Sequence, residues 1–383
     1  MSLRNLKTVK ERQDYLKTNH HLSLKYIKVY PKELEIAQER NCENMVGAVS
    51  VPLGLAGPLN INGLYAKREY FIPLATTEGA LVASVNRGIK ALNLSGGAVV
   101  QSEYQGITRG SVFKSRGIKE SMILKEWISN HKNDLSEIAK STSSHLQMKE
   151  IKTIITGRNV YVRFSFDTMD AMGMNMITIA ATKMVAYIKD QTGQICLSVA
   201  GNFDTDKKPS WLNFINGRGR QVWAEGRISA EVVEKVLKTT PQAIYEVCRE
   251  KCLMGSIVSG SLGFNAHFAN MIAAIFIATG QDVAHTVEGS LGITATDIIG
   301  KDLYISIYLP DLILGTVGGG TALPAQLEAL SILGIAGGDK GKNANVFAEI
   351  VGGSVLAGEL SLLASLAEGS LAKAHVNLGR IRK

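Results

Sequence analysis

Apolar and polar side chains alternate along several stretches of the chain. Residues 158–166 are one example, with apolar side chains at Val160, Val162, Phe164 and Phe166. A period of two predicts a β-strand with one buried face. Residues 44–75 also alternate, and the pair Asn62-Gly63 between apolar residues indicates a β-hairpin. Further strands are predicted at 99–114, 196–200, 303–309 and 311–317.

Other stretches repeat apolar residues with a helical spacing. Residues 1–40 are charged, carry a thin apolar stripe, and are predicted to form amphipathic helices. Thr76 or Thr77 is a suitable N-cap for a helix over 80–92. The strand–helix–strand order within 111–197 suggests a small α+β module inserted into a larger one. Further helices are predicted at 117–150, 170–191, 228–251 and 267–280, and two alanine- and leucine-rich helices follow near the C-terminus.

The composition is that of a globular protein. Of the 383 residues, 45% are hydrophobic and 20% are charged. The net charge of +8 favours anionic partners. The lysines are spread out without a polybasic run, which favours a small anionic ligand over nucleic acid. The 38 glycines indicate many tight turns or close backbone approaches.

Cysteine usage and hydropathy suggest a cytoplasmic protein. The four cysteines form no CxxC pair, and Cys248 and Cys252 have the spacing of packing positions on one helix. The polar N-terminus does not resemble a signal peptide. Met271–Thr279 is taken as the most apolar stretch, and it is much shorter than the roughly 20 residues of a membrane span. We therefore expect no membrane insertion.

The most informative stretch is Gly201–Pro209, which follows the apolar run Ile195–Ala200. This order predicts a strand that ends in a rigid, cationic loop. Asp206 is expected to orient Lys207, and Pro209 restricts the backbone just beyond the lysines. Such a loop suits an acidic acyl substrate whose carbonyl group must be polarised. Taken alone, a solvated turn with two surface lysines is the more common structure.

Three further residues are candidates for acid–base chemistry. Asp282 follows an apolar helix and Gly280, so we expect a partly buried carboxylate that needs a cationic partner, and Lys207 is suited to that role. Glu78 lies near the start of a predicted helix, where a carboxylate either stabilises the helix dipole or acts as an acid. His375 lies near the C-terminus and is either incidental or a proton donor on a closing flap.

Two glycine-containing segments are candidates for nucleotide binding. Asp170–Met176 lies between a strand and a helix, where a glycine lets backbone N–H groups approach a phosphate. The dinucleotide fingerprint GxGxxG is absent, so an ordinary capped helix with core methionines is the alternative. Gly315–Thr321 either cradles a phosphate or forms a tight turn. We find no Ser-His-Asp order, HExxH motif, P-loop or metal-ligand spacing, and we expect no metal.

These motifs occur in the order and approximate spacing found in 3-hydroxy-3-methylglutaryl-CoA (HMG-CoA) reductase, and the chain resembles the class I form. The resemblance extends over nearly the whole chain from about residue 40, and ordered motifs over this length are highly specific. We expect no membrane anchor of the kind found in eukaryotic members, which would be a similarity to the soluble archaeal enzymes. The segments that carry the resemblance are Glu43–Gly47, Thr76–Gly79, Asp170–Met176, Thr205–Pro209, Gly280–Asp282, Gly315–Thr321 and Lys373–His375.

The resemblance implies a four-electron reduction of HMG-CoA to mevalonate and free CoA, with two equivalents of NADPH. Lys207 would polarise the thioester carbonyl and stabilise the developing oxyanion. Glu78 would supply a proton to the mevaldehyde oxygen, and Asp282 would hold the network of Lys207 and Glu78. His375 would protonate the departing CoA thiolate. The basic charge balance agrees with two polyanionic ligands.

The resemblance also implies residues that bind the two ligands. Five residues match the family's contacts to the HMG group, namely Arg109, Asp206, Lys208, Lys251 and Asn270. Cofactor binding is implied for Asp170, Ala171, Met172, Gly173, Met174, Asn175, Ser143, Arg158, Val317 and Gly318.

The fold that the resemblance implies is of the α+β class. A large α/β domain around a long central helix, formed by 41–110 and 198–383, would bind HMG-CoA. Residues 111–197 would form an inserted ferredoxin-like domain that binds NADP, and 1–40 a helical segment. The implied assembly is a homodimer or homotetramer with active sites shared across an interface, without nucleic-acid or membrane partners. Glu43–Gly47 would lie at that interface.

Two positions depart from the family pattern. Ala200 stands where a serine that contacts the HMG carboxylate is expected. Ser143–His145 lacks the arginine expected at the 2′-phosphate of NADPH, and Lys149, Lys152 and Arg380 are candidate substitutes. The preference for NADPH over NADH therefore rests on class alone.

Three alternatives remain open at this point. The same fold could use NADH or oxidise mevalonate, it could be a catalytically inactive homologue that binds CoA or a nucleotide, or the basic chain could bind nucleic acid. The presence of Glu78, Lys207, Asp282 and His375 favours an active enzyme. The lack of a clustered basic stripe argues against nucleic acid.

Overall fold

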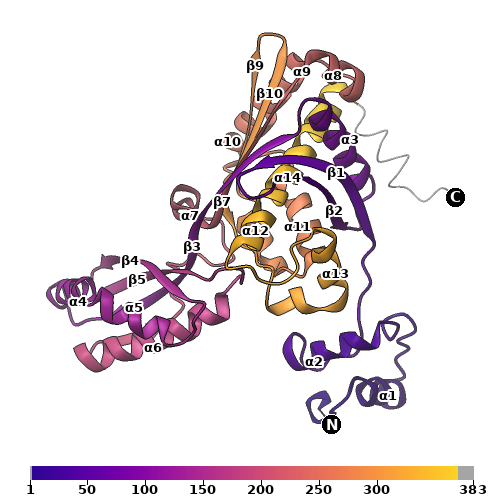
Figure 1. The fold of residues 1–383 in the computed structure, drawn as a ribbon. Coiled ribbons are helices and arrows are strands. Elements are labelled where there is room, and N and C mark those ends of the chain that lie inside the picture. The colour runs from indigo at the N-terminus through magenta and orange to yellow at the C-terminus, as the bar shows by residue number, and fades with distance from the viewer. Residues whose placement is uncertain (1, 370–383) are drawn as a thin grey trace.

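A computed structural model describes residues 2–369 and shows a mixed α+β fold (Figure 1). A large sheet packs around the long helix α14 (Lys342–Glu368), and a smaller group of strands and helices extends to one side. The N-terminal helices lie at the lower end of the view. The predicted α+β class is confirmed. The domain boundaries near residues 40, 110 and 197 stay a prediction, and His375 and Arg380 lie outside the described residues.

The strands of the described residues form one mixed sheet with the main order β2-β1-β3-β7-β10-β9-β8. β1 runs antiparallel to β2 and parallel to β3, whereas β7 is antiparallel to both β3 and β10. The strands are β1 (Leu53–Gly63), β2 (Glu69–Ala75), β3 (Ala98–Lys114), β4 (Gln147–Thr156), β5 (Asn159–Asp167), β6 (Ile195–Ser198), β7 (Arg218–Ile228), β8 (Gly263–Phe264), β9 (Gly292–Ile299) and β10 (Asp302–Leu312).

The helices cover the sheet and fill the ends of the molecule (Figure 1). Besides α14, the α-helices are α1 (Val9–His20), α2 (Ala37–Arg40), α3 (Leu81–Leu94), α4 (Ile118–Asn130), α5 (Lys132–Lys140), α6 (Met174–Thr192), α7 (Trp211–Asn216), α8 (Ala230–Val232), α9 (Pro241–Val247), α10 (Ser256–Ser259), α11 (Phe268–Thr279), α12 (Thr286–Gly289) and α13 (Pro324–Ile332). Two π-helical segments, Val233–Leu237 and Cys248–Gly255, continue α8 and α9.

Strand β3 belongs to both parts of the sheet. Its first half pairs with β7, from Val99 opposite Glu225 onward, and its second half pairs with β5, from Ile107 opposite Phe166 onward. Two separate hydrophobic cores form on either side of this division. The larger and smaller parts are therefore connected by a continuous strand, which restricts their relative position.

Helix α14 is the centre of the larger core. It is long and apolar enough to cross a membrane by length and composition, but most of its residues are buried inside the protein. The sequence analysis compared only the short stretch Met271–Thr279 with a membrane span and overlooked the longer helix α14. In the described chain no other helix meets the same criteria. Its all-round apolar character follows from packing against the sheet and against α3 and α11.

Four strands were not predicted, namely β4, β7, β8 and β9. β4 contains Lys149, Glu150 and Lys152 and was expected to be part of a helical region. It is an edge strand paired with β5 on one side, so charged residues can point to water there. β7 was missed because its first residues include the arginines Arg218 and Arg220, which are fully buried by tertiary contacts.

Helix starts also differ from the expected ones. α3 begins at Leu81 after Ala80, which has a positive φ of 76°, and no side chain caps it. The Thr76 hydroxyl instead accepts the N–H of Glu78 at 3.0 Å, so the predicted threonine N-cap is wrong. Strand β5, helix α11 and the β1–β2 hairpin are confirmed, whereas residues 313–317 do not continue β10.

Replacement of Gly88 by alanine is expected to destabilise the fold. A Cβ atom at Gly88 of α3 would overlap the carbonyl group of Ala357 in α14. Alanine normally favours a helix by about 1 kcal/mol over glycine, but overpacking costs about 1–3 kcal/mol, so the steric effect should win. Denaturant unfolding measures the change. The control is Gly117→Ala, where the added Cβ meets open space; an equal effect of both variants would contradict this account.

Candidate active site

The loop between β6 and α7 holds Lys207 in a restrained conformation. Asn202, Thr205 and Lys207 have positive φ angles of 63°, 57° and 55°. Residues other than glycine rarely adopt this region, and such strain persists only where the surroundings maintain it. Ser210 ends the loop by capping α7 with its hydroxyl group. The backbone around Lys207 is therefore fixed by contacts and not by its own preference.

Lys207 forms an ion pair with Asp282. The Lys207 Nζ atom lies 2.7 Å from Asp282 Oδ2, and both side chains remain partly exposed. Asp282 also accepts the N–H of Ala284 at 3.0 Å and so caps the short 3₁₀-helix Val283–His285. The pairing that the sequence analysis expected is therefore present.

This pair keeps both groups charged over a wide pH range. The hydrogen bond to Asp282 raises the pKa of the Lys207 amine, against the opposing effect of burial. Burial raises the pKa of the Asp282 carboxyl, but the hydrogen bonds from Lys207 and Ala284 outweigh it and hold the pKa below its ordinary value. A persistent ammonium group at a partly open position can polarise a carbonyl oxygen.

Asp206 was expected to orient Lys207, and it acts on the Lys207 ammonium through its charge and not through a hydrogen bond. Its Oδ1 atom accepts a hydrogen bond from Arg218 Nη2 at 2.9 Å instead. Arg218 is fully buried and also donates to Glu288 Oε1 at 3.2 Å. A buried guanidinium needs such anionic partners, which explains why Asp206 turns inward. Burial also raises the pKa of the neighbouring Asp311 to about 7, despite the cationic Arg218.

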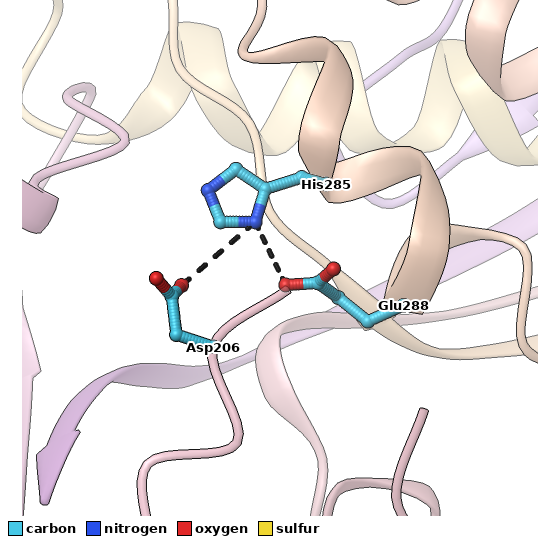
Figure 2. A group of neighbouring side chains, drawn as sticks. All are labelled: Asp206, His285 and Glu288. Carbon is cyan, nitrogen blue, oxygen red and sulfur yellow. Dashed lines mark hydrogen bonds and ion pairs between the residues drawn. The ribbon is translucent and has the colours of Figure 1, made fainter. Parts of the chain in front are cut away.

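Figure 2 shows Asp206, His285 and Glu288 grouped where the lysine loop, residues 199–210 between β6 and α7, meets α12. One potential ligand atom from each lies within 4.8 Å of the others, a grouping that can hold a metal ion. However, Arg218 already contacts both carboxylates, and its positive charge opposes a bound cation. The arrangement therefore favours an ion-pair network over a metal centre.

Lys207 and Asp282 open onto a cleft of about 630 Å³. The backbone bridge between Ala171 and Val317 joins its two main walls. Gly173, with a φ of 88°, precedes α6 at the wall, so the helix N-terminus faces the cleft side of the fold. The predicted cofactor residues that line this cleft are Ala171, Met172, Gly173, Met174, Asn175, Val317 and Gly318.

Asp170 has a structural role in this arrangement. Its side chain is buried, and its carboxylate accepts the backbone N–H groups of Asp339, Gly341 and Ala344 at 2.6–2.9 Å. These bonds attach the start of the cleft segment to the N-terminus of α14. The predicted contact of Asp170 with a cofactor stays a prediction.

The remaining predicted cofactor residues lie apart from the 630 Å³ cleft. Arg158 donates from Nε to the Ser115 carbonyl at 3.0 Å, and the Ser143 hydroxyl accepts the N–H of His145 at 3.2 Å. Neither Arg158 nor Ser143 lines this cleft. Arg40 and Asn41 line it instead, which the sequence analysis did not anticipate.

The predicted substrate residues occupy several positions. Arg109 Nη1 lies 3.3 Å from Asp204 Oδ2, and Lys208 Nζ donates to the Asp206 carbonyl at 3.1 Å. Lys251 lines a second cleft of about 870 Å³ beside Pro209. Asn270 lies in the first turn of α11 and lines neither cleft.

Glu78 is not brought to Lys207 within one chain. Its side chain is exposed, and among the residues described it lines neither the 630 Å³ nor the 870 Å³ cleft. No ion pair or hydrogen bond is found there between Glu78 and Lys207 or Asp282. Within the described part of one chain, Lys207 and Asp282 are therefore in contact with each other but not with Glu78.

Comparison with known proteins gives concordant results. The family model for hydroxymethylglutaryl-coenzyme A reductase matches residues 8–380. The 3-hydroxy-3-methylglutaryl-coenzyme A reductase of Methanothermobacter thermautotrophicus is 48% identical over 97% of this chain and 93% of its own length. That of Pyrococcus abyssi is 51% identical over 94% of this chain and 89% of its own length.

A solved structure shares the fold. The class II 3-hydroxy-3-methylglutaryl-CoA reductase of Streptococcus pneumoniae bound to NADPH superposes with a TM-score of 0.68 at 20% identity, covering 96% of this chain and 100% of its own. The matches define an oxidoreductase that acts on an acyl-CoA. The chain belongs to the hydroxymethylglutaryl-coenzyme A reductase family and is of the archaeal class I type. The resemblance found in the sequence is confirmed.

The variant Asp282→Asn is expected to lower the pKa of Lys207. The substitution keeps an oxygen acceptor but removes the negative charge, which weakens the interaction that raises this pKa above its ordinary value of 10.5, so the ammonium would lose its proton at lower pH. NMR titration of the Lys207 side chain, assigned with Lys207→Ala, measures the shift. Glu231→Gln, which breaks the exposed pair with Lys235, is the control; a Lys207 titration unchanged by Asp282→Asn would refute the coupling.

Proposed function

We propose that this protein reduces HMG-CoA to mevalonate and free CoA by two successive hydride transfers from NADPH. The observation that carries the proposal is that the Lys207–Asp282 pair opens onto the same cleft as the segment 171–176. Family membership supports the substrate. NADPH is supported by the Streptococcus pneumoniae reductase, which shares the fold and is bound to NADPH.

Lys207 acts on the reacting carbonyl in this proposal. Its ammonium group donates a hydrogen bond to the thioester oxygen and stabilises the negative charge that develops as a hydride arrives. Asp282 keeps the ammonium charged and directed. When bound, each of two successive NADPH molecules would supply one hydride, and the reaction takes up two protons in total. His375 gives one proton to the CoA thiolate, and Glu78 gives the other to the mevaldehyde oxygen.

The cleft residues orient the cofactor. Gly173 leaves the N-terminus of α6 uncovered by a side chain, so backbone N–H groups can approach a phosphate. Met174 and Met176 also line the cleft, and in this proposal their polarisable side chains pack against a flat ring of the cofactor. Asp170 holds this segment on α14. Arg109, Asp206, Lys208, Lys251 and Asn270 remain the proposed contacts of the HMG group.

We further propose that a second copy of the chain supplies Glu78 to Lys207. The support is that Glu78 is exposed and lines no cleft with Lys207 in its own chain. The protein would then act as a cytoplasmic homodimer or homotetramer with shared active sites, and Glu43–Gly47 would lie at the interface.

The first test is HMG-CoA-dependent oxidation of NADPH and NADH, followed by absorbance with mevalonate quantified. The expected result is NADPH oxidation at two equivalents per mevalonate, and a loss of at least about 10³-fold in kcat for a folded Lys207→Ala variant. A strong preference for NADH would overturn the cofactor assignment only. No oxidation of either by folded wild-type protein would favour an inactive binding homologue, and turnover by Lys207→Ala would refute the mechanism.

Mixing of two inactive variants tests the shared site. Glu78→Gln and Lys207→Ala homodimers are expected to be inactive, whereas co-expressed chains should recover about a quarter of wild-type sites, because half of randomly formed dimers are mixed and one of their two sites is intact. Activity per total protein is compared with each variant alone. If both residues act within one chain, the mixture stays inactive and the shared site is refuted.

A further inference from the structure

The short segment 282–288 holds Lys207 at two points. Asp282 pairs with the side-chain ammonium at 2.7 Å. Glu288 accepts the Lys207 backbone N–H at 2.9 Å. Because Lys207 has a left-handed backbone conformation with a φ of 55°, the second contact opposes relaxation to a more common conformation. The direction of the side chain therefore depends on both carboxylates.

Glu288 is the centre of this arrangement. It is fully buried, and its Oε1 atom accepts hydrogen bonds from three groups: the Lys207 backbone, Arg218 Nη1 at 3.2 Å and His285 Nδ1 at 2.7 Å. Figure 2 shows the hydrogen bond between Glu288 and His285. Charge-assisted bonds of this kind are shorter and stronger than neutral ones. One oxygen atom thus joins the lysine loop to β7 and to α12.

His285 lies between the two carboxylates that hold Lys207. Its side chain is almost fully buried, with Nδ1 bonded to Glu288. Its Nε2 atom lies 3.8 Å from Asp282 Oδ2 and has no hydrogen-bond partner among the residues that the structure describes. A small movement of Asp282 toward the ring would bring its carboxylate within hydrogen-bond distance of His285 Nε2. The imidazole ring is therefore a spacer that limits where the Asp282 carboxylate can go.

The charged groups around Lys207 lie close enough to influence one another. Two cations, Lys207 and Arg218, face the carboxylates Asp206, Asp282 and Glu288, and Asp206 Oδ1 also lies 4.0 Å from His285 Nδ1. Asp311 of β10 interacts electrostatically with Glu288. Removing one member changes the field at the Lys207 ammonium as well as the packing.

We propose that Glu288 and His285 are positioning residues for Lys207, with Glu288 holding its backbone and His285 holding Asp282 in line with its ammonium group. This inference rests on the proposed role of Lys207 in carbonyl polarisation. Neither residue touches substrate in this account. Displacement of a catalytic group by about 1 Å can lower a rate by about 10²-fold, so loss of either contact should reduce kcat.

The test compares purified full-length variants in the HMG-CoA reduction assay. Glu288→Gln keeps an oxygen acceptor for the Lys207 N–H but removes the charge, whereas Glu288→Ala removes both. His285→Asn keeps an N–H group near Glu288 and removes the ring atoms next to Asp282. The matched control is Glu349→Gln, since Glu349 is equally buried and accepts the backbone N–H groups of Tyr65 and Ala66 at 2.8 and 2.7 Å.

The expected result separates positioning from general destabilisation. Glu288→Gln should lose about 10-fold in kcat and Glu288→Ala about 100-fold, with KM for HMG-CoA changed less than about 3-fold. His285→Asn should lose about 3- to 10-fold in kcat. Glu349→Gln should lower the melting temperature but keep kcat within about 2-fold. NMR titration of Lys207 should shift to lower pH in Glu288→Gln and remain unchanged in Glu349→Gln.

Three outcomes would overturn the proposal. They are wild-type kcat in folded Glu288→Gln and His285→Asn, equal kcat losses in Glu288→Gln and Glu349→Gln, or an unchanged Lys207 titration in Glu288→Gln. If Glu288→Ala does not fold, the other two variants still decide. If Lys207→Ala is active, the proposed function itself has failed. If Lys207→Ala is inactive while the Glu288 and His285 variants are fully active, only the present inference is refuted.

Discussion

The buried guanidinium group of Arg218 is the constraint on which the active site depends. A charge removed from water is strongly unfavourable unless partners surround it. The chain provides these from four separate places: Thr108 of β3 at 2.9 Å, Met174 of α6 at 3.2 Å, Asp206 of the lysine loop at 2.9 Å and Glu288 of α12 at 3.2 Å. The need to satisfy one cation therefore brings the sheet, the cleft helix and the lysine loop to a common point.

Two further sets of contacts connect this point to the rest of the molecule. β3 pairs with β7 in the larger part and with β5 in the smaller part, so it limits their relative movement. Asp170 attaches the segment at the start of α6 to the N-terminus of α14 through three backbone N–H groups. A cleft built from distant segments can keep its shape because each wall is anchored in the hydrophobic core.

Much of the site could be predicted from the sequence, and the failures have physical causes. The Lys207–Asp282 pair was expected because a carboxylate after an apolar helix needs a cation. Asp206 was assigned to Lys207 from adjacency, but its carboxylate forms an ion pair with the buried Arg218. Glu288 and His285 were overlooked because their roles depend on contacts with Lys207 and Arg218, which are far away in sequence. Arg158 and Ser143 were carried over from the family; neither lines the 630 Å³ cleft, and their contact with a cofactor stays a prediction.

By itself, the sequence determined the α+β class, the family and strands such as β5, because local periodicity and ordered motifs are properties of contiguous residues. Only the tertiary structure decided the strand character of β4 and β7, since pairing with a neighbour and burial of Arg218 and Arg220 outweigh local preference there. The direction of the Lys207 side chain was also decided at this level, because its strained backbone and its charge are both held by residues of another segment.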